Sequence, residues 1–190
     1  MEALKKEALK KNVRYTYGDY EKWGDEVPRC ELIDGIVYDM AAPNVAHQSI
    51  SGNLFVQLHA FLKDKPCRVF AAPFDVRLNF DTADDIVVQP DILVICDKSK
   101  IENGKHCLGA PDFVIEVLSP SNSRHETIRK LEKYLEFGVS EYWVVDFVYK
   151  TVVAHRLVDN QYVTVTYSEA DHVPVLVLEG CTINLNEVFV

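Results

Sequence analysis

The stretch that decides the fold is "PDFVIEVLSPSN", residues 111–122, which has the composition of a buried β-strand ending in a turn. In an extended chain alternate side chains face opposite sides, so Glu116 shares a face with Val114 and Leu118. Apart from Glu116 both faces are apolar, as in a central strand covered on both sides. A lone carboxylate there loses its hydration and needs a cation, a proton or several hydrogen bonds in compensation.

The residues after this strand predict a helix and then a second buried strand. Ser123 and Glu126 have the spacing of a capping box and Gly138 is a typical stop, so we expect a helix over about residues 124–137. The segment "EYWVVDF", residues 141–147, has the composition of another covered strand. Together, the strand, helix and strand have the length of a right-handed parallel crossover.

Upstream of the opening stretch the sequence predicts two helices, a hairpin and two extended segments. Thr16 and Asp19 have the spacing of a helix cap, and Asp34-Gly35 between two apolar runs is a strong hairpin signal. Apolar residues recur at helical spacing from Ile50 to Leu62. The expected elements are a short helix in 16–26, the hairpin in 30–40, a helix over 46–63, and extended segments at 67–80, which Pro73 interrupts, and at 86–97.

The remaining residues have the composition of alternating β-structure, in the stretches "KTVVAHRL", "QYVTVTY", "VPVLVLE" and "INLNEVFV". We expect residues 1–190 to form a single domain with an N-terminal helix and hairpin (15–45), a core (46–147) and a C-terminal β extension (148–190). The order of elements predicts the α/β or α+β class, with a mixed β-sheet flanked by helices on both faces. The hairpin and the tail strands would extend or cover that sheet.

Composition and charge limit the possible functions. The chain has 48% hydrophobic and 26% charged residues, as ordinary globular proteins do, and no apolar run long enough to cross a bilayer. Its start, "MEALKKEALKKNV", is unlike a secretory signal, so we expect a cytoplasmic protein with no membrane contact. The net charge of -9 disfavours a protein that coats its whole surface with nucleic acid. It is compatible with an enzyme whose acidic metal ligands lie beside a local basic groove.

The cysteines predict no disulfide framework. They are odd in number, widely scattered and without a CxxC pair, which indicates reduced, mostly buried thiols: Cys30, Cys67, Cys96, Cys107 and Cys181. His106-Cys107 lies in a polar loop without identifiable partners for zinc. No Gly-rich phosphate loop supports nucleotide hydrolysis.

Asp91 is a second carboxylate inside a run of strand formers, "IVVQPDILVICD". Pro90 lacks an amide hydrogen, so we expect the strand to bend or bulge there. If the two acid-bearing strands are adjacent and antiparallel, Asp91 and Glu116 come close together. Two carboxylates cannot both stay charged in a dry site unless a cation bridges them, and hard divalent ions prefer oxygen ligands. Each acid alone also has an ordinary explanation, as the partner of a buried arginine or as a cap on the bulge.

These segments carry a resemblance to known nucleases. "QPD" followed by "VIEVLSPS", in this order of helices and strands, resembles the PD-(D/E)XK nuclease superfamily. The similarity is closer to the Uma-type restriction endonuclease family and spans about residues 15 to 150. Matching stretches are "YTYGDYEKW", "ELIDGIVYDMAAPNVAHQ", "APFDVRL", "VVQPDILVICD", "GAPDFVIEVLSPSN" and "KLEKYLEFGVSEYWVVD". The resemblance implies a restriction-endonuclease-like core in which Asp91 and Glu116 bind Mg²⁺ or Mn²⁺.

The resemblance also implies a catalytic lysine. The superfamily signature has this lysine two residues after the second acid, where the present chain has Leu118. The Uma-type pattern instead places it on the following helix, at Lys130, and Glu126 stands for the usual aspartate near the helix start. Helical spacing points the other way, because an apolar face that contains Ile128 and Leu131 leaves Lys130 as an exposed ion-pair residue.

Four further residues in matching segments each have two explanations. Glu31 is either a third metal carboxylate or a solvated strand residue. His47, at the start of a helix, either serves the site, by contacting phosphate or by relaying a proton, or lies on the surface. Gln89 either orients a ligand or bonds the backbone. Tyr134, one turn after Lys130, either flanks the site or packs in the core.

The sequence therefore predicts a metal-dependent endonuclease that hydrolyses DNA phosphodiester bonds and, as the resemblance implies, leaves a 5′-phosphate. A homodimer is expected because double-strand cutting generally needs two active sites, and the β-rich tail is a candidate interface. One alternative is a catalytically inactive nuclease-like fold acting as a binding or regulatory module, which Leu118 favours. The other is a structural assembly protein in which neighbouring side chains satisfy both acids.

Overall fold

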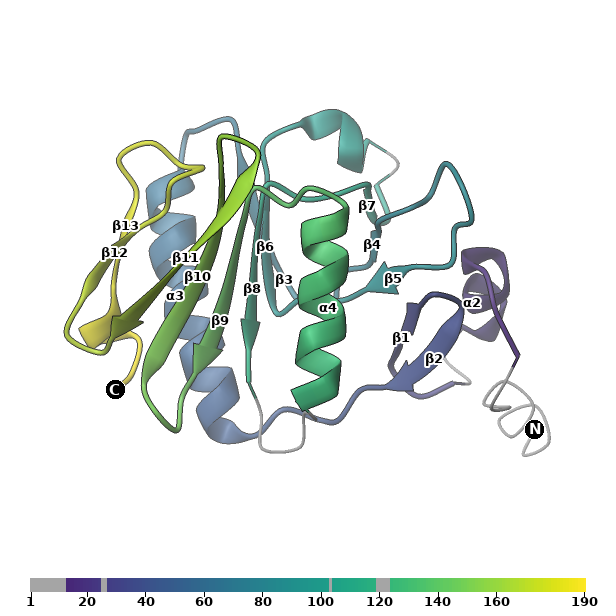
Figure 1. Ribbon diagram of the computed structural model, residues 1–190, viewed down its shortest axis with the longest axis horizontal. Coiled ribbons are helices and arrows are strands. Elements are labelled where there is room, and N and C mark those ends of the chain that lie inside the picture. The colour runs from purple at the N-terminus through teal and green to yellow at the C-terminus, as the bar shows by residue number, and fades with distance from the viewer. Residues whose placement is uncertain (1–12, 25–26, 103, 119–123) are drawn as a thin grey trace.

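A six-stranded mixed sheet occupies the middle of the molecule (Figure 1). The computed structural model describes residues 13–24, 27–102, 104–118 and 124–190, and for 124–127 the backbone alone. In spatial order the strands are β11 (Gln161–Ser168), β10 (Thr151–Val158), β9 (Glu141–Asp146), β8 (Phe113–Val117), β6 (Ile92–Ile95) and β3 (Arg68–Ala71). β8 and β9 are parallel and all other neighbours are antiparallel. The predicted parallel pair is confirmed.

A long helix covers each face of this sheet (Figure 1). α3 (Val45–Leu62) buries Ile50, Leu54 and Leu58 against the face that carries Ile115 and Val117. α4 (Arg124–Glu136) lies on the opposite face, where Tyr134 packs against Val114 and Tyr142. The predicted class, a mixed sheet flanked by helices, is confirmed.

The N-terminal hairpin belongs to a second sheet of short strands. Its spatial order is β2 (Ile36–Asp39), β1 (Cys30–Ile33), β5 (Val87–Val88), β4 (Val76–Arg77) and β7 (Cys107–Leu108). Asp34 and Gly35 form the two-residue turn with φ of 51° and 74°, the left-handed conformation that an Asp-Gly pair adopts in hairpins. α2 (Tyr17–Trp23) precedes the hairpin, with the Thr16 amide donating to the Asp19 carboxylate at 3.0 Å. Both local predictions are confirmed.

The chain crosses twice between the two sheets, each time near a proline. The extended segment 67–80 divides into β3 in the large sheet and β4 in the small one, with a cis Ala72–Pro73 bond between them. The segment 86–97 divides at Pro90 into β5 and β6, so the predicted bend is a change of sheet. The two crossings touch, because the Ala72 amide donates to the Asp91 carbonyl at 3.0 Å.

Two of the four predicted tail strands are not strands over their whole length. β10 and β11 form as expected, but "VPVLVLE" contributes only to β12 (His172–Pro174) and "INLNEVFV" only to β13 (Thr182–Asn184) before the 3₁₀ helix η3 (Leu185–Glu187). Val175 and Leu178 from a loop, and Leu185 from η3, are nevertheless buried in the core cluster that contains the inward face of α3. Apolar residues therefore mark burial here rather than a β ladder.

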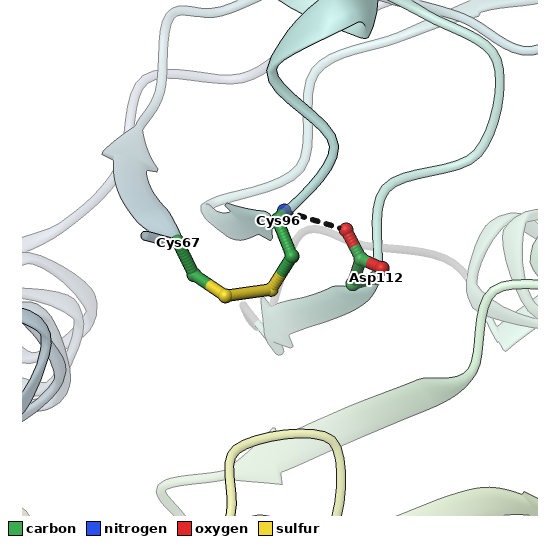
Figure 2. Close-up of a disulfide and its surroundings, with 3 residues drawn as sticks. All are labelled: Cys67, Cys96 and Asp112. Carbon is green, nitrogen blue, oxygen red and sulfur yellow. Dashed lines mark hydrogen bonds between the residues drawn. A yellow bond between two sulfur atoms is a disulfide. The ribbon is translucent and has the colours of Figure 1, made fainter. Parts of the chain in front are cut away.

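Cys67 and Cys96 form a disulfide, contrary to the expectation of reduced thiols (Figure 2). The pairing of Arg68 with Ile95 places these cysteines opposite one another at the ends of β3 and β6. The Cys96 amide donates to the Asp112 carboxylate at 2.7 Å. The other three cysteines are free and buried, as expected. The prediction failed because only the strand register brings together residues that are 29 positions apart.

The remaining short element is the 3₁₀ helix η2 (Lys98–Ile101), which precedes β7. Among the residues that the structure describes, no helix has the length and apolar character that crossing a membrane requires.

Candidate active site

A cavity of about 250 Å³ opens where the chain crosses between the two sheets. Its walls come from β1, the start of α3, the two crossings, β8 and α4. The predicted site residues Glu31, His47, Asp91, Glu116 and Lys130 all line it. Side chains from five separate segments thus meet in one place.

Asp91 and Glu116 are neighbours across two strands. β6 and β8 are antiparallel with Ile92 opposite Ile115, and one further step of this register places Asp91 opposite Glu116. The Val117 amide donates to Asp91 Oδ2 at 2.8 Å, so the carboxylate lies against β8. This is the juxtaposition that the strand pattern predicted. Asp91 itself lies in the crossing just before β6 rather than at mid-strand.

His47 also contacts the Asp91 carboxylate. Its Nε2 lies 3.2 Å from Asp91 Oδ2, and the side chain is buried. The Asn44 side chain caps α3 by accepting from the His47 amide at 2.9 Å, which fixes the position of the imidazole on the first turn. Burial disfavours the charged ring, but the Asp91 carboxylate outweighs it and raises the pKa of His47. His47 is therefore a site residue and not a surface one.

Lys130 is the cation inside the cavity. Its Nζ lies 2.5 Å from Glu116 Oε1 and 2.8 Å from Glu31 Oε1, and Tyr134 donates to the same Glu116 oxygen at 2.9 Å. Burial opposes the charge on Lys130, but Glu116 and Glu31 overcome it and raise the pKa of the lysine. Burial raises the pKa of Glu116 to about 8, with Asp91 and Glu31 adding to the effect and Lys130 opposing it.

Helical spacing predicted the wrong face of α4 as the buried one. Ile128 is 44% exposed, whereas Lys130 is 7% exposed and Tyr134 fully buried. Lys130 and Tyr134 are one turn apart and so share a face. That face meets a polar cavity, and for this reason hydrophobic periodicity did not identify it.

Glu31 and Gln89 connect the small sheet to the site. Glu31 is 1% exposed, which excludes the solvated alternative, and its Oε1 accepts from both Lys130 and the Gln89 amide. The Gln89 side chain accepts from Arg29 Nε at 2.5 Å and donates to Asp75 Oδ1 at 2.7 Å. Gln89 thus bonds both to a neighbouring acid through its backbone and to a cavity residue through its side chain.

The carboxylates of the cavity are the candidate ligands for a divalent cation. Within the described residues the side-chain contacts of Glu116 all go to Oε1 and those of Asp91 to Oδ2, so each carboxylate keeps one uncommitted oxygen. No group of three or more His, Cys, Asp or Glu in that part of the chain could hold a metal ion. The residues fit a hard cation held by two carboxylates and water, which is a common arrangement for Mg²⁺.

Two buried polar atoms of the cavity lining lack partners among the described residues: His47 Nδ1 and the Tyr142 hydroxyl. A buried polar group without a hydrogen bond costs about 1–3 kcal/mol, so such atoms mark places where water or a ligand completes the site. Sequence reasoning missed Tyr142 because it lies in an otherwise apolar strand. It also missed Arg29, which lies in a bend just before β1, where strand alternation gives no signal. Glu126 lies on α4, but its side chain is outside the described residues.

The fold and the cavity define a nuclease-like α+β protein, and comparison with known proteins agrees. The model of the Uma2 family, described as "Putative restriction endonuclease", matches residues 17–186. The chain therefore belongs to the Uma2 family. A search of curated proteins gives no match.

A solved structure shares the fold. It is titled as a putative nuclease belonging to DUF820 from Anabaena variabilis, and it superposes with a TM-score of 0.75 at 23% sequence identity. The match covers 92% of the present chain and 97% of the other. The mixed sheet flanked by helices that the sequence predicted is thus shared with this solved structure.

Proposed function

We propose that this protein is a metal-dependent endonuclease that hydrolyses DNA phosphodiester bonds. The observation that supports it most directly is the meeting of Asp91, Glu116 and Lys130 in one cavity. The lysine comes from a helix, but its amine reaches the Glu116 carboxylate at 2.5 Å. Leu118, at the usual lysine position, lines the same cavity without a charge.

In this proposal Asp91 and Glu116 would hold Mg²⁺ or Mn²⁺, whereas Glu31, predicted as a third metal carboxylate, accepts from Lys130 and the Gln89 amide. A cation bound there would supply Lewis-acid polarisation of the phosphate and a water of lowered pKa. Lys130 places a positive charge where negative charge develops on the phosphate. Glu31 and Tyr134 hold Lys130 and Glu116 in place, and His47 holds Asp91. The product would carry a 5′-phosphate.

The test is nicking of supercoiled plasmid with Mg²⁺ or Mn²⁺. We expect Asp91→Ala, Glu116→Ala and Lys130→Ala each to lower the rate by at least about a hundredfold, as loss of a transition-state contact does. Lys133→Ala is the matched control, because Lys133 lies on the same helix and contacts Asp34 and Glu136 instead of the cavity acids. Equal activity in wild type and the three site variants would contradict the assignment.

A catalytically inactive binding module is the second candidate. It is favoured by the contact between Lys130 and Glu116, which gives the buried acid a partner without a metal ion. Calorimetric titration with Mn²⁺ separates the two, since the enzyme requires binding that Asp91→Ala and Glu116→Ala abolish. Wild-type protein that binds DNA but neither Mn²⁺ nor Mg²⁺ would favour the module.

We also propose a homodimer in the cytoplasm. β11 is an edge strand of eight residues with Val163 and Val165 exposed, and such an edge is a ready template for pairing with a second copy. Light scattering on a size-exclusion column tests this, and a monomer at every concentration would contradict it.

A further inference from the structure

Arg29 is an uncommitted cation of the candidate cavity. Its side chain is exposed and also lines the cavity, so it lies where the cavity opens to solvent. The two other cationic groups there are engaged, Lys130 by Glu31 and Glu116, and His47 by Asp91. Arg29 has no ion pair with any residue that the structure describes; its side-chain contact is the bond from Nε to Gln89. Both terminal amino groups of the guanidinium therefore remain available.

A buried amide holds this guanidinium in place. Gln89 is 7% exposed and accepts from Arg29 Nε at 2.5 Å. Its own amide nitrogen donates to Asp75 Oδ1 at 2.7 Å and lies 3.1 Å from the Tyr20 hydroxyl. These two contacts of the amide nitrogen fix the orientation of the Gln89 side chain. A neutral amide fixes Arg29 without cancelling its charge, which a carboxylate in the same place would do.

The cavity places Arg29 beside the acids. Arg29 lies in a bend immediately before β1, and its side chain lines the same cavity as Glu31, Asp91 and Glu116. The Met40 amide donates to the Arg29 carbonyl at 2.9 Å, which continues the pairing of β1 with β2 through this position. Arg29 is therefore anchored to β2 through its backbone, at a bend immediately before β1.

We propose that Arg29 binds a backbone phosphate of the nucleic acid strand next to the phosphate at which Asp91 and Glu116 act. This rests on the proposed function and names a residue that positions its substrate. A guanidinium presents its amino groups as a planar fork that matches two phosphate oxygens. In a cavity with three carboxylates, an uncancelled arginine at the opening offsets their repulsion of the substrate. The Gln89–Asp75 pair serves to orient Arg29.

The test combines equilibrium binding with kinetics. Binding of a fluorescein-labelled DNA duplex is followed by anisotropy in EDTA over a range of NaCl concentrations. We expect Arg29→Ala to reduce the slope of log affinity against log salt by about one phosphate contact. In plasmid nicking with Mg²⁺, we expect Arg29→Ala to raise KM at least about tenfold, as loss of a charged hydrogen bond does, with kcat changed far less.

Two variants check the geometry. Arg29→Lys keeps the charge but loses the fork and the bond to Gln89, so its KM should lie between those of wild type and Arg29→Ala. Gln89→Ala should raise KM several-fold while leaving the salt slope unchanged, because the charge remains but is no longer oriented. Arg68→Ala is the matched control, since Arg68 is exposed at the far end of β3 and does not line the cavity.

The outcomes separate this inference from the proposed function. Protein that binds DNA without cutting it contradicts the nuclease, and the salt slope of Arg29→Ala still tests the phosphate contact. An unchanged slope in Arg29→Ala, or an equal loss in Arg68→Ala, overturns the inference whether or not DNA is cut. A wild type that binds no DNA at any salt concentration overturns both.

Discussion

At the scale of single residues, two opposing effects act on the pKa of Glu116. It is 8% exposed near the end of β8, where burial favours the protonated acid, while Lys130 at 2.5 Å favours the carboxylate. Asp91 and Glu31 add negative charge nearby, and the balance raises the pKa of Glu116 to about 8. The carboxyl group therefore carries a proton over a range of pH in which an unfolded chain has released it.

This proton makes the stability of the metal-free protein depend on pH. From the unfolded pKa of about 4.3 up to about 8, the folded state binds the extra proton, so the free energy of unfolding falls as pH rises, by at most about 1.4 kcal/mol per unit. We expect Glu116→Gln to remove this part of the decline. Urea unfolding in EDTA across the interval measures it. The raised pKa of His47 also lowers stability with rising pH, and because Glu116 contributes to that shift, Glu116→Gln should reduce the His47 part of the decline as well. Parallel curves for the two proteins would contradict the prediction.

The sequence revealed the acids of the site more readily than the cation. Asp91 and Glu116 interrupt apolar strand segments, and a charged residue within an apolar run can be recognised from a single sequence. Lys130 lies on a helix whose inward face is polar, because that face meets the cavity and not the apolar core. Only the family resemblance indicated it, and amphipathic spacing pointed to the wrong side of α4.

At the scale of elements, two prolines separate the strands that build the site. The positions of β3, β4, β5 and β6 follow from apolar runs and proline breaks, but their division between two sheets does not. A break in a strand pattern shows that the ladder stops and does not show where the chain continues. The same limit hid the Cys67–Cys96 disulfide, which depends on the register of β3 with β6.

The disulfide should stabilise the fold by restricting the unfolded chain. It closes a loop with a sequence separation of 29, for which loop-closure entropy gives about 3–4 kcal/mol. We expect the double variant Cys67→Ser/Cys96→Ser to lose about this much in urea unfolding. Reductant should lower the free energy of unfolding of the wild type to that of the double variant, and it should leave the variant's own value unchanged. A wild type insensitive to reductant would show that the bond is absent or makes no contribution.

At the scale of the whole molecule, one buried ion pair joins the large sheet to the C-terminal segment. Glu141 on β9 is fully buried and accepts from Arg156 Nε on β10 at 2.9 Å. Its other oxygen accepts from the amides of Leu176 and Val177, at 2.6 and 3.2 Å, and Arg156 also donates to the Pro174 carbonyl. Glu141 resembles Glu116 as an acid within a strand, but an arginine and backbone amides occupy both of its oxygens.

Glu141→Ala and Arg156→Ala should therefore each lower the free energy of unfolding by about 3–5 kcal/mol, since either leaves an unpaired buried charge. The double variant should lose less than the sum, because it leaves neither charge behind. Hydrogen exchange at residues 172–184 should quicken in each single variant.

Lys150→Ala, which breaks the exposed pair with Glu169, is the control and should cost about 0–1 kcal/mol. Additive losses would show that the two residues stabilise the tail independently. Because neither residue lines the cavity, the plasmid-nicking rate per folded molecule should stay at the wild-type level, which would distinguish this structural acid from Glu116.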